Sequence, residues 1–294
     1  ARTGNLDLIV NMNNSVLDSL LPVEKPLIDP YLAKFDVAIQ PGLETLNWQS
    51  DGVTEFIGDS MEQVKVVHGI LKTTKDNLSA VQDIVNKWDR PMIERKTKPM
   101  EKEEFERTFK SMQASNFSNI KDAGDQIHSL LKETNNVLRV SESSAEWQRY
   151  VEFVNSVIVN GLSAAIITSL EFLLDQINPE SIRRDGRLPL FEIMLIVNGT
   201  DGINFQPPLG HDANGIGMAD MIDNVIGSFF QISTLFKRLD GEGTYMGEMH
   251  SDSAINSVLT SLSDSILTNG KKCHDLKKNF DKYSYLWETD LTSY

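Results

Sequence analysis

The chain has 294 residues, 40% hydrophobic and 24% charged, so it can bury one large core or two or three smaller ones. Its 42 acidic residues outnumber 28 basic ones and give a net charge of −14, which argues against direct binding to nucleic acid or anionic lipid. A single cysteine, Cys273, excludes a disulfide framework within the chain and fits a reducing compartment.

The N-terminal part predicts short helices interrupted by proline. An amphipathic helix is expected from Asn5 to Leu21. Pro22, Pro26 and Pro30 then interrupt helix formation, because each removes a backbone donor and fixes φ. Asp29 is expected to cap a second short helix, with Pro30 at its first position.

The stretch from Thr54 to Trp88 predicts a long amphipathic helix. Its apolar side chains recur at alternating steps of three and four, and only one member of the series is polar: Val64, Val67, Leu71, Thr74, Leu78, Val81, Val85 and Trp88. Such a 3.5-residue repeat places one narrow apolar seam along a helix, as in a coiled coil, so other long helices must cover it. Trp48 is expected to anchor the start of this helix by packing, and Trp88 its end.

Two further long helices are expected after a basic, proline-broken linker from Arg90 to Met100. Acidic residues after the linker predict a helix start, and apolar positions extend from Phe105 to Leu138. The sequence Ser143-Ser144-Ala145-Glu146 predicts a capping box for a third helix that runs to Ile177.

The third helix contains a stretch that matches a short membrane span in length, because Phe153 to Leu170 carries no charge over 18 residues. Six polar residues interrupt the stretch, Glu152 and Glu171 flank it, and no belt of positive charge surrounds it. We therefore expect a central helix buried on most of its faces, and no membrane contact.

The periodicity then changes to that of a β-hairpin. Leu190 to Val197 is β-branched and continuous, Asn198 to Gly202 predicts a turn, and Ile203 to Gln206 returns as a partner strand. Phe191 and Phe205 are expected to anchor the hairpin. It has to pack on a helical body, because one hairpin alone is marginal in water.

Two helices are expected in the C-terminal part. A loop from Gly210 to Gly217 precedes a fourth helix from Met218 to Leu239. A polar, Gly-rich loop from Glu242 to Asp252 leads to a fifth helix, which carries apolar positions from Ile255 to its expected anchor, Trp287. No short sequence period recurs, so the pattern predicts unequal long helices rather than a regular repeat array.

Three residues in the last loop are candidates for contact with a partner protein: Tyr245, Met246 and Met249. An exposed Tyr–Met cluster suits a protein contact. The alternative, which we favour, is that this loop packs onto its own bundle.

Signals for catalysis are weak. The sequence contains no P-loop, and Gly215-Ile216-Gly217 is too short to indicate dinucleotide binding. The five histidines lack the convergent spacing of a zinc site. His211 beside Asp212 could orient a base, but ordinary solvated surface is the favoured interpretation. Cys273 lies in phase with an apolar seam, which favours a packed thiol over a nucleophile. We expect no catalytic residue, metal or cofactor.

Several stretches together resemble the tail, or stem, of dynein heavy chains, and the axonemal group more than the cytoplasmic one. The resemblance is carried by short motifs that occur in the expected order: Pro22 to Leu27, Pro41-Gly42-Leu43-Glu44-Thr45-Leu46-Asn47-Trp48-Gln49-Ser50 running into Phe56-Ile57, Pro189 to Ile193, Ile203 to Leu209, Arg238-Leu239, and Tyr283-Ser284-Tyr285-Leu286-Trp287. They are spread over nearly the whole chain.

This resemblance implies a mainly α fold, an elongated bundle of long helices with one small β-hairpin. It would comprise a first bundle over residues 1–178, a hairpin insertion over 179–210, and a second bundle over 211–294 that leads toward the linker. The implied function is a non-catalytic stem segment, since the ATPase motor lies elsewhere in such heavy chains. The implied location is the cytoskeleton of the cilium or flagellum, the axoneme.

The resemblance also implies protein partners: other dynein heavy chains, intermediate and light chains, and docking proteins. Direct contact with tubulin is not expected, because tubulin and this chain are both acidic. Two other readings stay open. A spectrin-like or tethering-complex scaffold predicts three-helix repeats of even length and no hairpin, and an all-helical enzyme predicts carboxylates or histidines that line a closed pocket.

Overall fold

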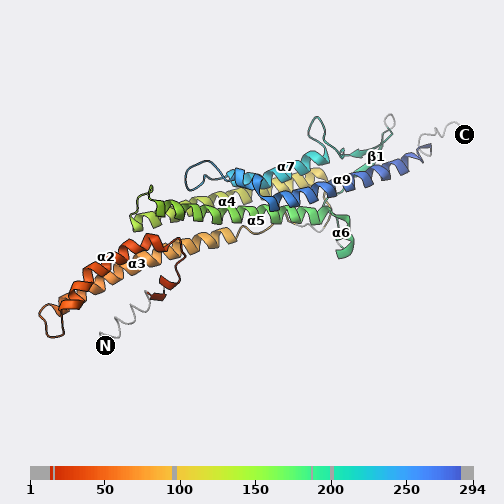
Figure 1. Cartoon of the computed structure of the whole chain (residues 1–294). Coiled ribbons are helices and arrows are strands. Elements are labelled where there is room, and N and C mark those ends of the chain that lie inside the picture. The colour runs from red at the N-terminus through yellow and green to blue at the C-terminus, as the bar shows by residue number, and fades with distance from the viewer. Residues whose placement is uncertain (1–13, 16, 95–97, 187, 199–201, 286–294) are drawn as a thin grey trace. The chain divides into compact units, whose positions relative to one another are not determined.

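The structure, a computed structural model, describes residues 14–15, 17–94, 98–186, 188–198 and 202–285. Within these ranges the chain is mainly helical, with one two-stranded sheet (Figure 1). The elements in chain order are α2 (Lys25–Thr45), α3 (Val53–Asn86), α4 (Lys102–Leu138), α5 (Ala145–Ile177), α6 (Pro179–Asp185), β1 (Met194–Asn198), β2 (Gly202–Gln206), α7 (Met218–Gln231), the 3-10 turn η1 (Ile232–Thr234), α8 (Met246–Ser251) and α9 (Ser253–Asp281). The expected mainly α fold with one small hairpin is thus confirmed.

The contacts divide the chain into two units, which interleave along the sequence. Unit 1 comprises Ala1–Asn86, Ala123–Ile158 and Arg238–Glu242, and unit 2 comprises Lys87–Asp122, Val159–Lys237 and Gly243–Tyr294. The division falls within α4 and within α5. The three successive domains expected from the sequence stay a proposal.

The apolar seam of α3 is confirmed. Every position of the predicted series from Val64 to Trp88 is buried, including the polar Thr74. The Thr74 hydroxyl donates to the carbonyl oxygen of Ile70, 2.9 Å away. Its O–H group is therefore hydrogen-bonded although the side chain is buried. A 3.5-residue repeat therefore located the buried face of this helix correctly.

The predicted break before Pro30 is wrong, because α2 begins at Lys25 and runs through Pro30 and Pro41. Pro26 lies in the first turn, where a missing N–H removes no helical hydrogen bond. Three apolar side chains of α2 are buried: Leu27, Ile28 and Ile39. Burial of this face offsets the one hydrogen bond that Pro30 removes.

Close packing joins α2 to α3 within unit 1. A Cβ atom at Gly42 would lie 2.1 Å from the Phe56 ring, so a larger residue there would require that ring to shift. The Tyr31 hydroxyl also donates a hydrogen bond to the Leu138 carbonyl at the end of α4. Residues 5–13 and 16 of the helix expected from Asn5 to Leu21 lie outside the described residues, and within the rest Asn14, Ser15, Leu17 and Asp18 are helical.

The turn between α4 and α5 is short and polar. Arg139 adopts a positive φ of 48°, and Asn135 Nδ2 donates to the Val140 carbonyl oxygen at 3.2 Å. The cap of α5 is Ser144, whose Oγ accepts from the Trp147 N–H at 3.2 Å. The cap is therefore one residue later than the predicted Ser143, and it is a simple N-cap rather than the predicted capping box, because the third helical residue is Trp147.

Helix α5 is long and apolar enough to cross a membrane by length and composition, with a mean hydropathy of 1.9 over its most apolar window, of which 44% is buried. A core helix passes the same test. Between Val151 and Ile177 the exposed residues are all polar: Glu152, Ser156, Asn160 and Glu171. This pattern supports the expected central helix with one solvated face.

The hairpin pairs β1 and β2 antiparallel, with Leu195 opposite Phe205 and Val197 opposite Ile203. The first strand begins at Met194, later than expected. Phe191 instead forms a parallel bridge with Met100, in which the Met100 N–H donates to the Leu190 carbonyl oxygen at 3.0 Å. This bridge ties the segment before the hairpin to the start of α4.

The fourth helix ends earlier than predicted. α7 stops at Gln231 rather than near Leu239, and η1 follows it. The hydroxyls of Ser228, Ser233 and Thr234 each donate to a carbonyl three residues earlier, which competes with helical hydrogen bonding. Phe236 leaves the helix and packs between two aromatic rings, those of Trp88 at 6.2 Å and Tyr245 at 5.5 Å between centroids.

The expected loop from Glu242 to Asp252 contains the short helix α8. Asp252 then caps α9, because its Oδ1 accepts from the Ala254 N–H at 2.8 Å. The Ser163 hydroxyl of α5 donates to the same carboxylate, so the cap also joins α9 to the core of unit 2. Hydrogen bonding to Ser163 is the largest factor that lowers the pKa of Asp252.

Candidate functional site

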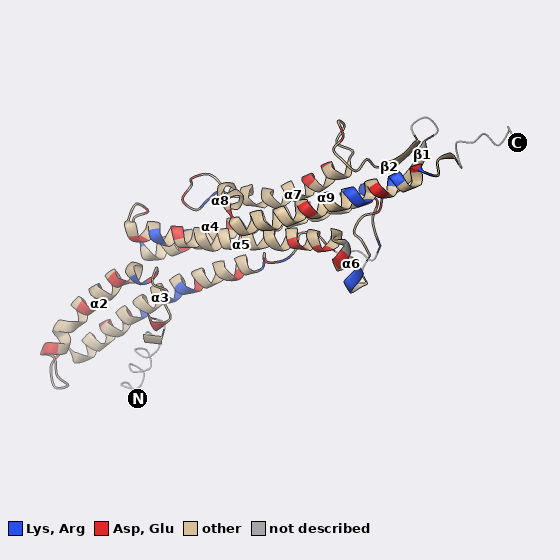
Figure 2. Ribbon diagram, turned by 45° about the vertical axis from the view of Figure 1, so that its right-hand side comes forward, with Lys and Arg blue, Asp and Glu red and all other residues tan. Residues whose placement is uncertain are grey.

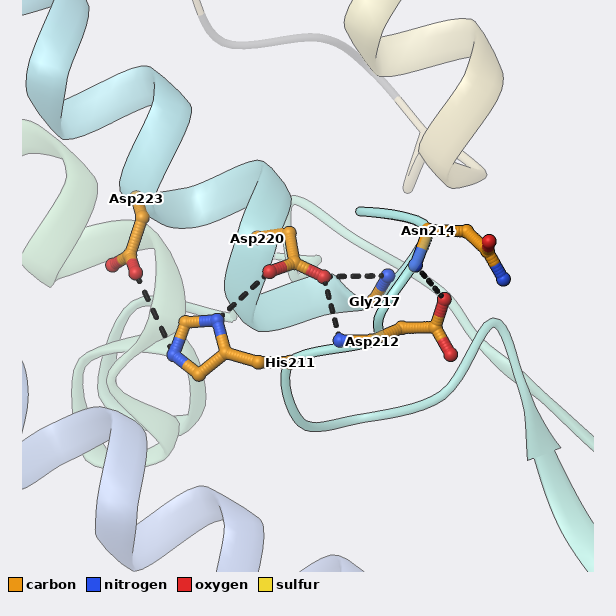
Figure 3. Close-up of polar contacts among 6 residues, drawn as sticks. All are labelled: His211, Asp212, Asn214, Gly217, Asp220 and Asp223. Atoms are coloured by element: carbon orange, nitrogen blue, oxygen red, sulfur yellow. Dashed lines mark hydrogen bonds and ion pairs between the residues drawn. The ribbon is translucent and has the colours of Figure 1, made fainter.

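A cluster of polar side chains lies where the loop before α7 meets the helix (Figure 3). His211 Nδ1 is 2.8 Å from Asp220 Oδ1, and His211 Nε2 is 3.6 Å from Asp223 Oδ2. The other oxygen of Asp220 accepts from the backbone N–H groups of Asp212 at 2.9 Å and Gly217 at 3.1 Å. One carboxylate thus holds the imidazole and both ends of the loop.

The sequence folds this way because Gly217 is the N-cap of α7 and Asp220 is its third residue. A carboxylate in a first helical turn accepts unpaired backbone N–H groups and complements the helix dipole. A Cβ atom at Gly217 would lie 1.8 Å from the Gly210 carbonyl oxygen, so glycine is required for space.

The electrostatics of this cluster follow from its hydrogen bonds. The pKa of His211 is raised, first by its hydrogen bond to Asp220. The pKa of Asp220 is lowered, first by the backbone N–H of Asp212 and then by His211. Because His211 and its partners are solvent-accessible, the cluster is a surface clamp rather than a buried catalytic group.

This geometry agrees with the favoured interpretation of His211 as solvated surface, because its side chain is 67% exposed, but the alternative interpretation had assigned it the wrong carboxylate. Its partner is Asp220, not the neighbouring Asp212, whose carboxylate instead accepts from the Asn214 N–H at 2.8 Å. Both imidazole nitrogens face carboxylates. Among the described residues, no group of three or more His, Cys, Asp or Glu side chains could hold a metal ion. Recognising Gly217 as a helix cap would have found Asp220 three residues later.

Unit 1 contains a second polar cluster, which is buried. Asn77 Nδ2 donates to Thr134 Oγ1 at 3.1 Å, and the Thr134 hydroxyl donates to the Leu130 carbonyl oxygen at 2.9 Å. Tyr150 lies beside them. Its pKa is raised, mainly by burial and to a smaller extent by the charge of Glu24. The space these residues line has no room for a water molecule. We therefore interpret the cluster as a packed polar core.

Glu24, which lies near Tyr150, has a buried carboxylate oxygen that lacks a hydrogen-bond partner. Its Oε2 accepts from the Leu21 N–H at 2.7 Å, while its buried Oε1 has no hydrogen-bond partner. The residue is 1% exposed, and burial is the largest factor that raises its pKa. Desolvation disfavours the charged carboxylate here.

A surface groove of about 350 Å³ lies between α4 and α7. Phe105 and Phe109 form part of its lining, and their rings stack 5.6 Å apart. Glu106 at its edge pairs with Lys102 at 2.7 Å. Since no His, Cys or Ser lines it, the groove has none of the usual nucleophile and base pairs.

The predicted anchors have different outcomes. Trp88 is buried and packs against Phe236, but Trp48 is 80% exposed, so its expected role as a packed anchor is wrong. Phe191 contacts Phe105 edge to face at 4.7 Å. Phe205 is half-buried in β2, and Trp287 lies outside the described residues.

The predicted partner contact is wrong for two of its three residues. Tyr245 and Met249 are fully buried, and Met246 is half-buried with its sulfur 3.3 Å from the Ser233 hydroxyl. The loop therefore packs onto its own unit, which was the favoured alternative. Cys273 is half-buried, and burial raises the pKa of its thiol, which agrees with a packed thiol.

The C-terminal half of α9 is rich in basic residues (Figure 2), and it also exposes apolar side chains. Only Ile255 and Leu262 of this helix are buried, both in its first half. Further along, Leu276, Phe280 and Tyr283 are 50%, 45% and 55% exposed. This surface, rather than the loop at Tyr245, is the candidate contact site. The apolar spacing of α9 was visible in the sequence, but the exposure of its C-terminal half was not.

Comparison with known proteins gives one consistent family. Residues 1–56 match the family described as dynein heavy chain, N-terminal region 1. The chain is 38% identical over 289 residues to the dynein beta chain of the flagellar outer arm from Chlamydomonas reinhardtii, a match that covers 97% of this chain and 6% of that protein.

Two other relatives agree. The ciliary dynein beta chain of Heliocidaris crassispina is 30% identical over 290 residues, and the human dynein axonemal heavy chain 9 is 28% identical over 293 residues. Each match covers 97% of this chain and 6% of the relative. The chain therefore spans only a small part of the length of the proteins it resembles.

Proposed function

Because this chain belongs to the N-terminal tail region of the axonemal dynein heavy chains, we propose that it is a non-catalytic structural segment of such a tail. The similarity to axonemal relatives over 97% of the chain carries this proposal. In this role the chain is a scaffold that links motor heads to the doublet microtubule of a cilium or flagellum.

The packing supports a mechanical role. α3, α4 and α5 have 34, 37 and 33 residues, so each is about 50 Å long or more at 1.5 Å per residue. The buried seam of α3 extends over most of its length. Side chains packed along a continuous seam resist bending, because bending would open many contacts together.

The two polar clusters of the described residues have structural roles. The His211 cluster ties a loop to a helix, and the Asn77 cluster has no room for a ligand. The similarity lies in the tail region, whereas hydrolysis of ATP is expected of the motor elsewhere in such heavy chains. A spectrin-like scaffold fits less well, since the described helices range from 6 residues in α8 to 37 in α4 and a hairpin is present.

Partners follow from the same proposal. We propose other heavy chains, intermediate and light chains and docking proteins as its contacts, and no direct contact with tubulin. Its location would be the axonemal cytoskeleton.

The proposal is tested by fractionating ciliated cells that express the tagged full-length heavy chain. We expect recovery in the axonemal fraction together with dynein intermediate chains. Recovery in the general cytoplasm without any dynein subunit would overturn the axonemal assignment. A separate measurement of ATP hydrolysis by the 294-residue chain should stay at background, and microtubule-stimulated turnover would refute the non-catalytic role.

A further inference from the structure

The end of α9 presents an apolar stripe to solvent. Leu276, Phe280 and Tyr283 follow one another at steps of four and three, so they lie along one side of the helix and the turn after it. All three are about half exposed. The adjoining side of the helix is covered in part by the hairpin, because Lys277 Nζ donates to Asn204 Oδ1 of β2 at 3.1 Å.

The same stretch is basic although the chain is acidic. Between Lys271 and Lys282 there are five lysines and two aspartates, a local charge of +3, against −14 for the whole chain. Lys272 and Lys277 lie within one helical turn of the stripe and border it on its two sides. The other three lysines, Lys271, Lys278 and Lys282, lie on the opposite side of the helix, roughly half a turn away at 100° per residue.

We propose that this stripe docks an amphipathic α-helix of another protein, one whose apolar ridge is bordered by Asp and Glu. Three apolar residues at helical spacing provide a ridge into which the side chains of a second helix can pack. The bordering lysines select acidic flanks by charge complementarity. A membrane surface is disfavoured, because the chain as a whole carries a net charge of −14, which anionic lipid repels.

This inference goes beyond the proposed function, because it rests on the surface chemistry of α9 and not on the family. It also differs from the predicted contact at Tyr245 and Met249, both of which are buried.

The test uses the whole 294-residue chain and three synthetic probes of equal length, measured by fluorescence anisotropy. The first is an amphipathic helix with Leu on its ridge and Glu on both flanks, the second has Lys in place of Glu, and the third is polyglutamate. We expect binding of the first probe only. Equal binding of polyglutamate would overturn the apolar part of the proposal, and equal binding of the Lys probe would overturn its charge selection.

Matched variants locate the site. Lys272→Glu should weaken binding of the acidic helix about tenfold at low salt, whereas Lys278→Glu, with the same charge change on the opposite side, should leave it nearly unchanged. Phe280→Ser should also weaken binding, while Leu267→Ser, at a residue 63% exposed on another side of α9, should not. Equal loss in each pair would refute a site on the stripe.

Two further measurements complete the test. Thermal melts of the four variants should match the parent chain, so that lost binding reports the surface and not unfolding. Binding of the parent chain to anionic lipid vesicles, or formation of a dimer through Phe280 in sedimentation, would overturn the proposed occupant. None of these outcomes changes the ATP hydrolysis test, so the two proposals fail separately.

Discussion

Asn155 of α5 holds Asp240 and its neighbour with both ends of one side-chain amide. Its Nδ2 donates to Asp240 Oδ2 at 3.0 Å, and its Oδ1 accepts from the Leu239 N–H at 3.2 Å. Asn155 is 2% exposed, so these bonds are made away from bulk water. Asp240 also pairs with Arg238 at 3.0 Å. A short segment late in the chain is thus fastened into unit 1.

Replacing Asn155 with Ala should destabilise the protein by about 1–3 kcal/mol, because the Leu239 N–H loses its acceptor in a partly buried place. Chemical denaturation measures this change. Asn160→Ala, on the exposed side of the same helix, is the matched control and should change stability by less than about 0.5 kcal/mol. Similar losses for the two variants would show that the hydrogen bonds to the 238–242 segment contribute little.

The two tryptophans on either side of α3 should behave oppositely. Trp88→Ala removes a buried ring that packs against Phe236 and should cost about 3–5 kcal/mol. Trp48→Ala alters an exposed residue and should cost within about 0.5 kcal/mol. Thermal melts of both variants under one buffer condition test this, and a large loss for Trp48→Ala would contradict its exposure.

Glu24 should make stability depend on pH in a predictable direction. Its pKa is raised in the folded state, so its contribution is fully present below its ordinary value near 4.5 and is lost as the pH rises through the raised pKa. Glu24→Gln keeps an acceptor for the Leu21 N–H and removes the charge. The variant should therefore melt higher than the parent at pH 7, and the difference should vanish near pH 4. A lower melting temperature at pH 7 would indicate that the charged form is stabilised.

The contact between His211 and Asp220 should depend on pH at both ends of its range, because the pKa of His211 is raised and that of Asp220 is lowered. The raised pKa of His211 means that its contribution is present below 6.5 and is lost as the pH rises through the shifted value. The lowered pKa of Asp220 means that its contribution is present above 3.8 and is lost on acidification through the shifted value. The clamp should hold best between these two limits.

An NMR titration of the His211 imidazole measures this directly. We expect an apparent pKa above 6.5 in the parent chain and a fall toward 6.5 in Asp220→Asn, which removes the charge that His211 contacts. Asp212→Asn is the control, because Asp212 contacts Asp220 through its backbone. An unchanged pKa in Asp220→Asn would show that the contact is absent in solution.

The sequence was sufficient for the long helices, because their burial repeats every three or four residues over many turns. It failed at Pro30, where the local signal for a helix start was outweighed by burial of Leu27, Ile28 and Ile39. It failed again at Phe236, whose apolar spacing continued the pattern of α7 although its ring packs outside the helix. Both errors arise because local patterns do not specify which distant surface covers a residue.

The candidate sites were harder to predict for the same reason. The Asp220 partner of His211 is nine residues away, and the loop between them has to fold back before they meet. Trp48 is large and apolar, yet nothing in its neighbourhood reports that it stays exposed. The exposure of Phe280 at the end of α9 could not be predicted either, because Phe280 continues the apolar spacing to which the buried Leu262 belongs.

Because the two units interleave along the sequence, the order in which the chain is synthesised determines when each unit can be completed. Unit 1 includes Arg238–Glu242, which Asn155 holds, so this unit stays incomplete until the ribosome has passed Glu242. Helices α2 and α3 of this unit emerge more than 150 residues earlier and meet each other first. A nascent chain stalled before residue 238 would therefore carry a helical pair with part of its final covering not yet translated.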